Sequence, residues 1–351
     1  MNICYFGIYK KEYPRNRNIL KGLELNGAKI IEVCDTTSGL IKFWYLFKKH
    51  WLIRKEYDLM IIGFAGQIIV PFAKLITRKP VVYDLHVSYY DSIVLERRQV
   101  KKGTIKAFYY YFLDWLACRL ADRILLDTKE HVEYISRLLH VPKGKFIVVY
   151  TGINEDVFKP QKERKTDNDK FIISFHGYIQ PLNGMDLVVR AMEKLKNENI
   201  ELWIIGGGPE YGNIRKLAEK LKLKNIIFYG PMPYAELSEK ISRADLGLGF
   251  FSQSKKIDRV IANKVYELMA MKIPVLTGTS IGTAEQFKHR EHIYYCQRGS
   301  VEAISEAILG LRNNKDLRDA LAKNAYNYVR KELNPKMLGK KLLPELEKLI
   351  I

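Results

Sequence analysis

Cysteine is scarce in this chain, with four residues of this type among 351. They stand far apart, and no two of them form a C-x-x-C pair: Cys4, Cys34, Cys118 and Cys296. This spacing excludes a disulfide framework and a cysteine-based zinc site. It also predicts a cytoplasmic protein, because free thiols persist in a reducing compartment. The first residues enter a strand pattern directly, so we expect no signal peptide.

Long uninterrupted apolar runs are also missing. The most apolar stretch is Leu59 to Ile76, and it contains two glycines, a proline, a glutamine and a lysine. A helix that spans a membrane needs about 20 consecutive apolar residues. The stretch instead predicts a strand, a loop and a helix, so we expect no transmembrane segment.

Acidic residues are too few to balance the basic ones. The chain has 58 lysines and arginines against 39 aspartates and glutamates, which gives a formal net charge of +19. That excess favours an anionic ligand, an anionic membrane surface or nucleic acid as a partner. The chain has no zinc-finger spacing, RNP signature or arginine-rich tail, so we expect no nucleic-acid partner.

What is present is a regular alternation of strand and helix patterns, which predicts parallel sheets covered by helices. A length of 351 residues suits two domains. We predict a first Rossmann-like domain over residues 1–158, a polar linker over 159–169 and a second Rossmann-like domain over 170–333. An amphipathic helix over 334–351 lies outside the repeating pattern.

Strands are expected at the start of each repeat. In the first domain they fall at 2–7, 28–34, 59–63, 80–84, 123–127 and 146–150. In the second domain they fall at 171–176, 200–205, 226–229, 246–250, 275–277 and 293–296. Ligands of doubly wound sheets bind at the carboxyl ends of the strands, so the loops that follow these strands carry the candidate site.

Three residues of the first domain lie at that edge. Gly7 follows the first strand and allows a tight turn against a ligand, and Arg15 further along can meet a phosphate. His86 follows the strand at 80–84 and can orient a sugar hydroxyl. The alternatives are structural: a turn with a surface arginine, and a histidine of the core.

Two glycine-rich loops occupy the same edge of the second domain. HGYIQPLNGMD contains Gly177 and Gly184, and the helix that begins at Gly184 offers its N–H groups to an anion. IIGGGPE contains Gly207 and Gly208 at the end of the next strand. Neither G-x-G-x-x-G nor G-x-x-x-x-G-K-[ST] occurs, which counts against a dinucleotide oxidoreductase and a P-loop NTPase.

The stretch RVIANKVYELMAMKIPVLTGT, from Arg259 to Thr279, predicts a helix capped by Asn263 and then a strand. Lys264 and Glu267 are three residues apart, so they share one face of the helix near its amino end. That end suits a phosphate, and a carboxylate one turn further can hold a ribose diol. An ordinary surface salt pair is the alternative.

The helix expected over Leu40–Lys55 mixes aromatic and basic residues. It interleaves Phe43, Trp44, Tyr45, Phe47 and Trp51 with Lys42, Lys48, Lys49, Arg54 and Lys55. The mixture suits the boundary of an anionic membrane. Packing of the rings into the domain core is the alternative. A similar mixture over residues 96–112 favours the membrane surface.

In this order the motifs resemble those of the family 4 retaining glycosyltransferases of the GT-B fold. The resemblance covers nearly the whole chain and includes ADRILLDTKEHVEYI, YTGINEDVFKP, GYIQPLNGMD, GGGPE, ADLGLGF and NKVYELMAMKIPVL. It implies an α/β protein with two doubly wound, Rossmann-like domains facing a cleft and a C-terminal helix that crosses back to the first domain. It also implies transfer of a sugar, with retention, from a UDP- or GDP-linked donor without a bound metal or other cofactor.

The resemblance assigns roles to individual residues. Glu267 matches the glutamate that holds the donor ribose, Lys264 would lie by the diphosphate, and His86 matches the histidine beside the transferred sugar. Gly7, Arg15, Gly177, Asn183, Gly184, Gly207, Gly208 and Arg259 complete the expected donor-binding residues.

The sequence departs from the family pattern at three positions. Arg259 stands where members often have a glutamate that contacts the donor sugar. Tyr178 and Asn183 stand where many members have a basic pair. The leaving diphosphate still needs a cation or a dipole. Lys264 and Arg259 are therefore our first candidates for stabilising the leaving diphosphate, and Lys255 and Lys256 are our second.

These features predict a metal-independent hexosyltransferase that acts on a lipid-linked or cell-surface glycan at the inner face of the cell membrane. Two alternatives remain open. One is an inactive relative that serves as a scaffold or binding subunit of a glycan-assembly complex. The other is a sugar-nucleotide epimerase, which shares the fold but needs a set of acid–base residues.

Overall fold

The computed structural model describes residues 1–161 and 170–350, and it divides into two compact units. Unit 1 combines Met1–Gly152 with Leu333–Ile351, and unit 2 is Ile153–Glu332. The chain therefore leaves unit 1 at Gly152, six residues before the predicted end of the first domain at residue 158. Most of the predicted linker, residues 162–169, lies outside the described residues.

Unit 1 contains a six-stranded sheet in the order β2-β1-β3-β4-β5-β6, and its neighbouring strands are parallel. The strands are β1 (Asn2–Gly7), β2 (Lys29–Cys34), β3 (Leu59–Ile62), β4 (Val81–Asp84), β5 (Arg123–Leu126) and β6 (Phe146–Val148). Each expected strand is present, within three residues of its predicted ends. The central strands β3 and β4 are buried along their whole length, as a sheet covered on both faces requires.

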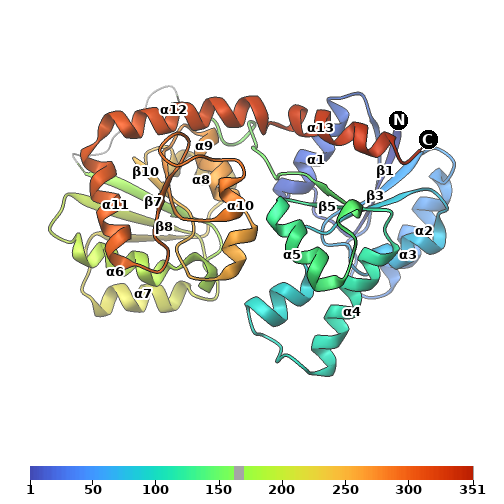
Figure 1. The fold of residues 1–351 in the computed structure, drawn as a ribbon, viewed down its shortest axis with the longest axis horizontal. Coiled ribbons are helices and arrows are strands. Elements are labelled where there is room, and N and C mark those ends of the chain that lie inside the picture. The colour runs from blue at the N-terminus through green and yellow to red at the C-terminus, as the bar shows by residue number, and fades with distance from the viewer. Residues whose placement is uncertain (162–169, 351) are drawn as a thin grey trace. The chain divides into compact units, whose positions relative to one another are not determined.

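The helices of unit 1 cover the two faces of this sheet (Figure 1). On one face, side chains of β1, β3, β4 and β5 form a core with four helices: α2 (Ile41–Ile53), α3 (Ile69–Ile76), α4 (Ile105–Leu120) and α5 (Lys129–Leu139). On the other face, Ile3, Tyr5 and Ile61 pack against α1 (Pro14–Glu24) and α13 (Pro335–Glu347). The last helix of the chain thus completes the core of the unit that contains the first strand.

The backbones of α1 and α13 touch at a pair of glycines. A Cβ added to Gly339 would lie 1.9 Å from the carbonyl oxygen of Gly22, and one added to Gly22 would lie 2.4 Å from the carbonyl oxygen of Pro335. Asn26 reinforces the contact, since its Nδ2 donates to the carbonyl oxygens of Gly22 and Lys336 at 2.7 and 2.8 Å. Only glycine at both positions permits this approach.

Unit 2 contains a second six-stranded parallel sheet, in the order β12-β11-β10-β7-β8-β9. Its strands are β7 (Phe171–His176), β8 (Ile200–Ile205), β9 (Ile226–Gly230), β10 (Leu246–Leu248), β11 (Val275–Gly278) and β12 (Tyr294–Cys296). The two sheets confirm the prediction of a two-domain, doubly wound α/β protein. The strand order reverses direction at β7, which is the switch point where ligands bind in such sheets.

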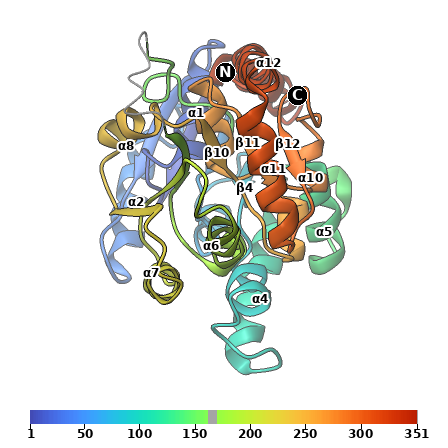
Figure 2. The ribbon, with the colours of Figure 1, turned by 90° about the vertical axis from the view of Figure 1, so that its left-hand side faces the viewer.

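One face of the second sheet packs against α6 (Met185–Lys194), α7 (Tyr211–Lys220) and α11 (Val301–Asn313) (Figure 2), and Leu321 of the following helix joins the same core. Strand residues Ile173, Phe175 and Ile204 are central to this core. The helix α9 (Asn263–Ala270) contacts β10, β11 and the long helix α12 (Lys315–Glu332). The remaining helices are α8 (Tyr234–Ile241) and the short α10 (Ile281–Ala284).

Two local predictions were wrong. Asn263 is the first residue of α9 and not its cap, because Ala262 takes the extended N-cap conformation without a capping side chain. The sequence pattern also missed a π-helical turn at Tyr90–Glu96. No helix within residues 1–161 and 170–350 combines the length and apolar character needed to span a bilayer.

The glycine contact yields a prediction about stability. Gly339→Ala should lower the free energy of unfolding by roughly 1–3 kcal/mol, because the new methyl group forces α1 and α13 apart. Chemical denaturation followed by circular dichroism measures the change. The control is Gly310→Ala in α11, where an added Cβ meets nothing within 4 Å. That control should be neutral or stabilising, since alanine favours helix. Equal destabilisation by both variants would contradict the account.

Candidate functional site

The carboxyl edge of the second sheet is built by two glycine loops that pack backbone against backbone. Gly177 follows β7 and Gly206 follows β8, and a Cβ on Gly206 would lie 2.1 Å from the carbonyl oxygen of Gly177. Gly208 has a φ of 146°, and its Cβ would lie 2.4 Å from the carbonyl oxygen of Ile179. Gly208, which we predicted to bind the donor, therefore allows the two loops to pack closely. Gly207 stands between them and faces Pro231.

Glu267 of α9 lies beside the end of β7. Its Oε2 is 2.8 Å from Nε2 of His176, the last residue of that strand. The histidine is 2% exposed and the side chain of Glu267 is 12% exposed, so the carboxylate retains a narrow access to solvent. Glu267 therefore lies at the edge of the sheet, with a partner that the sequence analysis did not identify, and its contact with a ribose stays a prediction.

Lys264 lies on the same face of α9 as Glu267, one turn nearer the amino end, and its amino group is buried. Its Nζ lies 3.3 Å from the centroid of the Phe175 ring and 5.6 Å from that of Phe250. This nitrogen has no hydrogen-bond partner among the described residues. Burial lowers the pKa of Lys264 well below its usual range, and the charge of Glu267 opposes this only in part. Lys264 is therefore a desolvated amine whose charged form is disfavoured by burial, and not half of a surface salt pair.

Lys264 also approaches the first glycine loop. A Cβ added to Gly177 would lie 4.0 Å from the lysine Nζ. The structure thus brings Gly177, Lys264 and Glu267 together at one corner of the sheet, with Gly207 and Gly208 in the adjoining loop. The amino end of α9, the end of β7 and the glycine loops converge there, as the sequence analysis predicted.

A shallow apolar hollow of about 420 Å³ opens on the other side of the glycine loops. Its walls come from the loops that follow β7, β8 and β9 and from α8: Gly177, Tyr178, Ile205, Gly206, Gly207, Pro231, Met232, Tyr234 and Leu237. A wall of glycine backbone and apolar side chains suits a flat ring that needs few directed polar contacts.

Two of the expected donor residues have other tasks. Asn183 is 1% exposed, and its Oδ1 accepts from the backbone N–H of Gln180 at 2.7 Å to close a capping box. Gly184 forms the left-handed turn before α6, where a Cβ would lie 2.6 Å from the amide nitrogen of Ser252. The prediction that Asn183 binds the donor was wrong, because the loop itself uses and covers its side chain. Arg259 ends a 3-10 turn, is 8% exposed, and stays a prediction.

In unit 1, His86 lies in a ring of aromatic side chains at the carboxyl edge of the sheet. Its Nε2 is 3.3 Å from the hydroxyl oxygen of Tyr13. Its ring meets Phe64 edge to face, with 5.1 Å between the ring centroids. His86 is 8% exposed and has a φ of 40°, so the chain turns sharply after β4 to present it. Gly7, with a φ of 138°, ends β1 at the same edge.

Arg15 is not available to a ligand. It is fully buried, its Nε donates to both carboxylate oxygens of Asp84 at 2.7 and 2.9 Å, and its Nη1 donates to the carbonyl oxygen of Val149. The prediction that Arg15 meets a phosphate was wrong. Its early position in α1 turns the side chain under the edge of the sheet, where it neutralises a buried carboxylate.

A second buried pair stands beside the first and was also missed. Nδ1 of His131 lies 2.6 Å from Oδ1 of Asp127, directly after β5. Burial favours the neutral form of Asp127, but the charge and hydrogen bond of His131, with smaller contributions from His86 and Arg15, lower its pKa to about 2. The signal in the sequence was the D-T-K-E-H spacing, which places an acid four residues before a histidine at a helix start.

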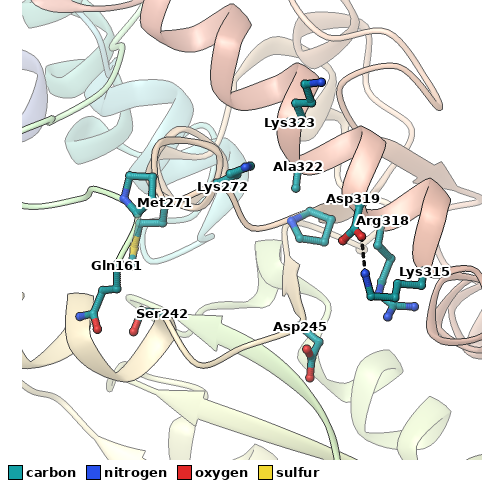
Figure 3. Close-up of a pocket in the computed structure, with 12 residues that line it drawn as sticks. Gln161, Ser242, Asp245, Met271, Lys272, Lys315, Arg318, Asp319, Ala322 and Lys323 are labelled. Carbon is teal, nitrogen blue, oxygen red and sulfur yellow. Dashed lines mark hydrogen bonds and ion pairs between the residues drawn. The ribbon is translucent and has the colours of Figure 1, made fainter. Parts of the chain in front are cut away.

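A further cavity, of about 570 Å³, lies in unit 2 at the amino ends of β10 and β11 (Figure 3). Asp245 and Pro274, which precede these strands, line it together with basic residues of α12. Lys315 pairs with Asp319 at 2.6 Å, and the Asp245 carboxylate accepts from the amide N–H of Ile172 at 2.8 Å. This cavity lies at the opposite edge of the sheet from His176 and Glu267, so it is not part of the candidate site.

Two family models together match residues 28–328. The model of the glycosyl transferases group 1 matches residues 156–328, and that of glycosyltransferase family 4 matches residues 28–157. The chain therefore belongs to the family 4, group 1 glycosyltransferases.

Comparison with curated proteins gives relatives in Mycobacterium tuberculosis and Mycobacterium bovis. These are D-inositol 3-phosphate glycosyltransferases that are 29% identical to this chain over 139 residues. The matched segment is 36% of this chain and 28% of the length of those proteins.

Solved structures resemble the whole chain at lower identity. HepE of Anabaena, determined with UDP and glucose, has a TM-score of 0.78 at 14% identity and covers 99% of this chain and 100% of its own. Sucrose-phosphate synthase of Thermosynechococcus elongatus has a TM-score of 0.77 at 13% identity, with 99% of both chains covered. A glycosyltransferase of Rickettsia africae has a TM-score of 0.73 at 14% identity and covers 99% of this chain and 98% of its own. The likeness shows the GT-B glycosyltransferase fold.

The buried pair in unit 1 gives a prediction. Asp84→Asn should lower the free energy of unfolding by about 3–5 kcal/mol, because it leaves the Arg15 guanidinium buried without its counter-charge. Denaturant unfolding measures the loss. The control is Asp319→Asn, which breaks the exposed Lys315–Asp319 pair and should change stability little. Unchanged stability of Asp84→Asn would contradict this pairing and restore the rejected role of Arg15 as a phosphate ligand.

Proposed function

We propose that the protein is a retaining glycosyltransferase that moves a sugar from a nucleotide-sugar donor to a lipid-linked or cell-surface glycan. One observation carries the proposal: a buried lysine without a hydrogen-bond partner among the described residues stands one helical turn from a partly exposed glutamate at the ligand edge of unit 2. The structure of HepE with UDP and glucose supports such a donor.

The base, the ribose and the diphosphate of the donor are each assigned to a different group along this edge. The apolar hollow between Gly207 and Pro231 accepts the base, whose faces are flat and apolar. Glu267 accepts hydrogen bonds from the ribose diol. Lys264 meets the diphosphate, which supplies the negative charge that its buried ammonium lacks. UDP and GDP are the nucleotides that we assign to this site.

Lys264 also has a catalytic task in this proposal. Breaking the bond between sugar and diphosphate develops negative charge on the leaving group, and a preorganised cation in a low-dielectric site stabilises that charge. The lysine takes this task without the basic pair that Tyr178 and Asn183 replace. We assign no metal ion to the reaction. No described group of three or more histidine, cysteine, aspartate or glutamate side chains is arranged to hold one.

Unit 1 contributes His86, which we assign to the transferred sugar. The two carboxylates near it are already engaged, Asp84 with Arg15 and Asp127 with His131. Neither is free to attack the sugar as a nucleophile, which supports direct transfer on the face that the diphosphate leaves. Tyr13 limits the position of the His86 ring through its hydroxyl group.

A second candidate is an inactive scaffold or binding subunit of a glycan-assembly complex. The observation that favours it is the pair Tyr178 and Asn183. A phenol and an amide carry no positive charge, so neither residue supplies a cation to a diphosphate. Tight nucleotide binding without turnover would identify this role. The epimerase alternative has no comparable support, since the carboxylates Asp84 and Asp127 are paired.

Turnover separates these roles. Wild-type protein should transfer or hydrolyse the sugar of at least one donor from a panel of UDP-, GDP- and dTDP-sugars. Lys264→Ala should lower kcat roughly 100- to 1000-fold, because it removes the cation that stabilises the leaving diphosphate. The control is Lys216→Ala, an exposed lysine on α7, which should keep its activity. Unchanged turnover in Lys264→Ala would contradict the role of this lysine.

We further propose that unit 1 docks on an anionic membrane. In α2, Phe43 packs against Phe72 and Leu46 is buried, but Trp44 and Trp51 are each 52% exposed. Basic groups lie over both exposed rings, Lys48 over Trp44 at 5.0 Å and Arg54 over Trp51 at 4.0 Å. Exposed indoles beside cations match the headgroup region of an anionic bilayer.

The start of α4 extends this pattern. Ile105 is 90% and Phe108 is 67% exposed, and residues 97–113 contain no acidic side chain. The helices α2, α3 and α4 pack on the same face of the sheet. An inner-face location of the protein would bring this side to the acceptor lipid.

Liposome flotation tests the membrane proposal. Wild-type protein should float with vesicles that contain anionic lipid and not with neutral ones. Changing Lys48, Lys49, Arg54 and Lys55 to Ser should abolish flotation, since each basic residue near the surface contributes about 1 kcal/mol. The control removes the same charge from unit 2 by changing the exposed Lys216, Lys220, Lys222 and Lys224 to Ser. Equal flotation of the α2 variant and wild type would overturn the proposal.

A further inference from the structure

We propose that His176 is a positioning residue that turns Glu267 toward the ribose of the donor and away from Lys264. The inference rests on the proposed function, because it takes Glu267 as the ribose contact. It adds a residue to which the sequence analysis gave no role, and it explains how the carboxylate and the amino group on one helix face remain available to two parts of a ligand.

The hydrogen bond between the two residues ties α9 to the end of β7. A carboxylate only accepts hydrogen bonds, so Nε2 of His176 carries the proton that is shared with Oε2 of Glu267 at 2.8 Å. This contact occupies Oε2 and leaves Oε1 for a ligand. The histidine is 2% exposed, so the donor does not reach it directly.

The backbone holds His176 rigidly. It is paired with Ile205 in the parallel register of β7 and β8, and Gly177 turns the chain immediately afterwards with a φ of 110°. The close approach of Gly206 to Gly177 fixes this turn. His176 therefore presents Nε2 from a strand end that cannot shift, which is the support that a binding carboxylate needs.

Lys264 is the competitor that the histidine excludes. Lys264 and Glu267 stand three residues apart on α9, the spacing at which opposite charges pair on a helix. The lysine Nζ nevertheless has no hydrogen-bond partner among the described residues, and it lies on the ring of Phe175. A Glu267 carboxylate without His176 would be free to rotate toward this ammonium. Both groups would then be lost to the ligand.

Nucleotides with and without a ribose diol test the inference. Isothermal titration calorimetry compares UDP with 2′,3′-dideoxy-UDP, and GDP with 2′,3′-dideoxy-GDP. The wild type should bind the tighter of the two ribonucleotides roughly 10- to 100-fold better than its dideoxy form, because hydrogen bonds to a charged group are lost. In His176→Ala this ratio should fall below about threefold, as expected when the carboxylate is no longer directed.

Two further variants separate positioning from support of the fold. His176→Gln keeps an N–H donor at the distance of Nε2 and should restore most of the wild-type ratio. His292→Ala removes another buried histidine of unit 2 and should keep the ratio unchanged. Thermal unfolding of each variant shows that the protein is folded.

The outcomes are distinct. An undiminished ratio in His176→Ala, or a His176→Gln protein as defective as His176→Ala, would overturn the inference and leave the proposed function intact. Wild-type protein that binds neither UDP nor GDP would contradict the proposed function itself, and the inference with it.

Discussion

A buried ammonium group needs a counter-charge, and the candidate site is organised around one that lacks it. Lys264 is 7% exposed and lies on an aromatic ring, with no hydrogen-bond partner among the described residues. Burying a charge in this way is costly unless a partner arrives. In the free protein this cost lowers the pKa of Lys264. A bound diphosphate would favour the charged form of the lysine again.

In unit 1, in contrast, two buried carboxylates each have a basic side chain as partner. Arg15 pairs with Asp84, and Asp127 pairs with His131, so buried pairs brace the carboxyl edge of that sheet. A sharp turn of the chain presents His86 at the same edge. We therefore assign binding of the donor nucleotide to unit 2, and to unit 1 a histidine for the sugar and an exposed surface for the membrane.

Much of this fold was readable from the sequence. Runs such as FIISFH and LMII predict buried parallel strands, and the break at Asp84-Leu85-His86 marks the end of one of them. The parallel order then brings every strand end to one edge, so Gly177, Lys264 and Glu267 were expected together. Helix ends were less certain, as Asn263 shows: its type favours a cap, but the preceding Ala262 already has the cap conformation.

The contacts of individual polar side chains were not readable, because they depend on distant parts of the chain. An arginine at position 15 suits a phosphate by its chemistry. In the folded chain, however, it forms an ion pair with Asp84, which lies 69 residues away in sequence. In the sequence, His176 has only the pattern of a strand residue. Its partner Glu267 lies 91 residues later in the chain, on α9. Asn183 is used by its own loop, which a motif comparison with basic residues does not reveal.

The most direct measurement is a crystal structure of the wild-type protein with a bound UDP- or GDP-sugar. The account predicts a diphosphate oxygen within about 3 Å of Lys264 Nζ and a ribose hydroxyl at the same distance from Oε1 of Glu267. The base should lie in the hollow between Gly207 and Pro231. A nucleotide bound away from α9, with Lys264 still buried on Phe175 and without an anion, would contradict it.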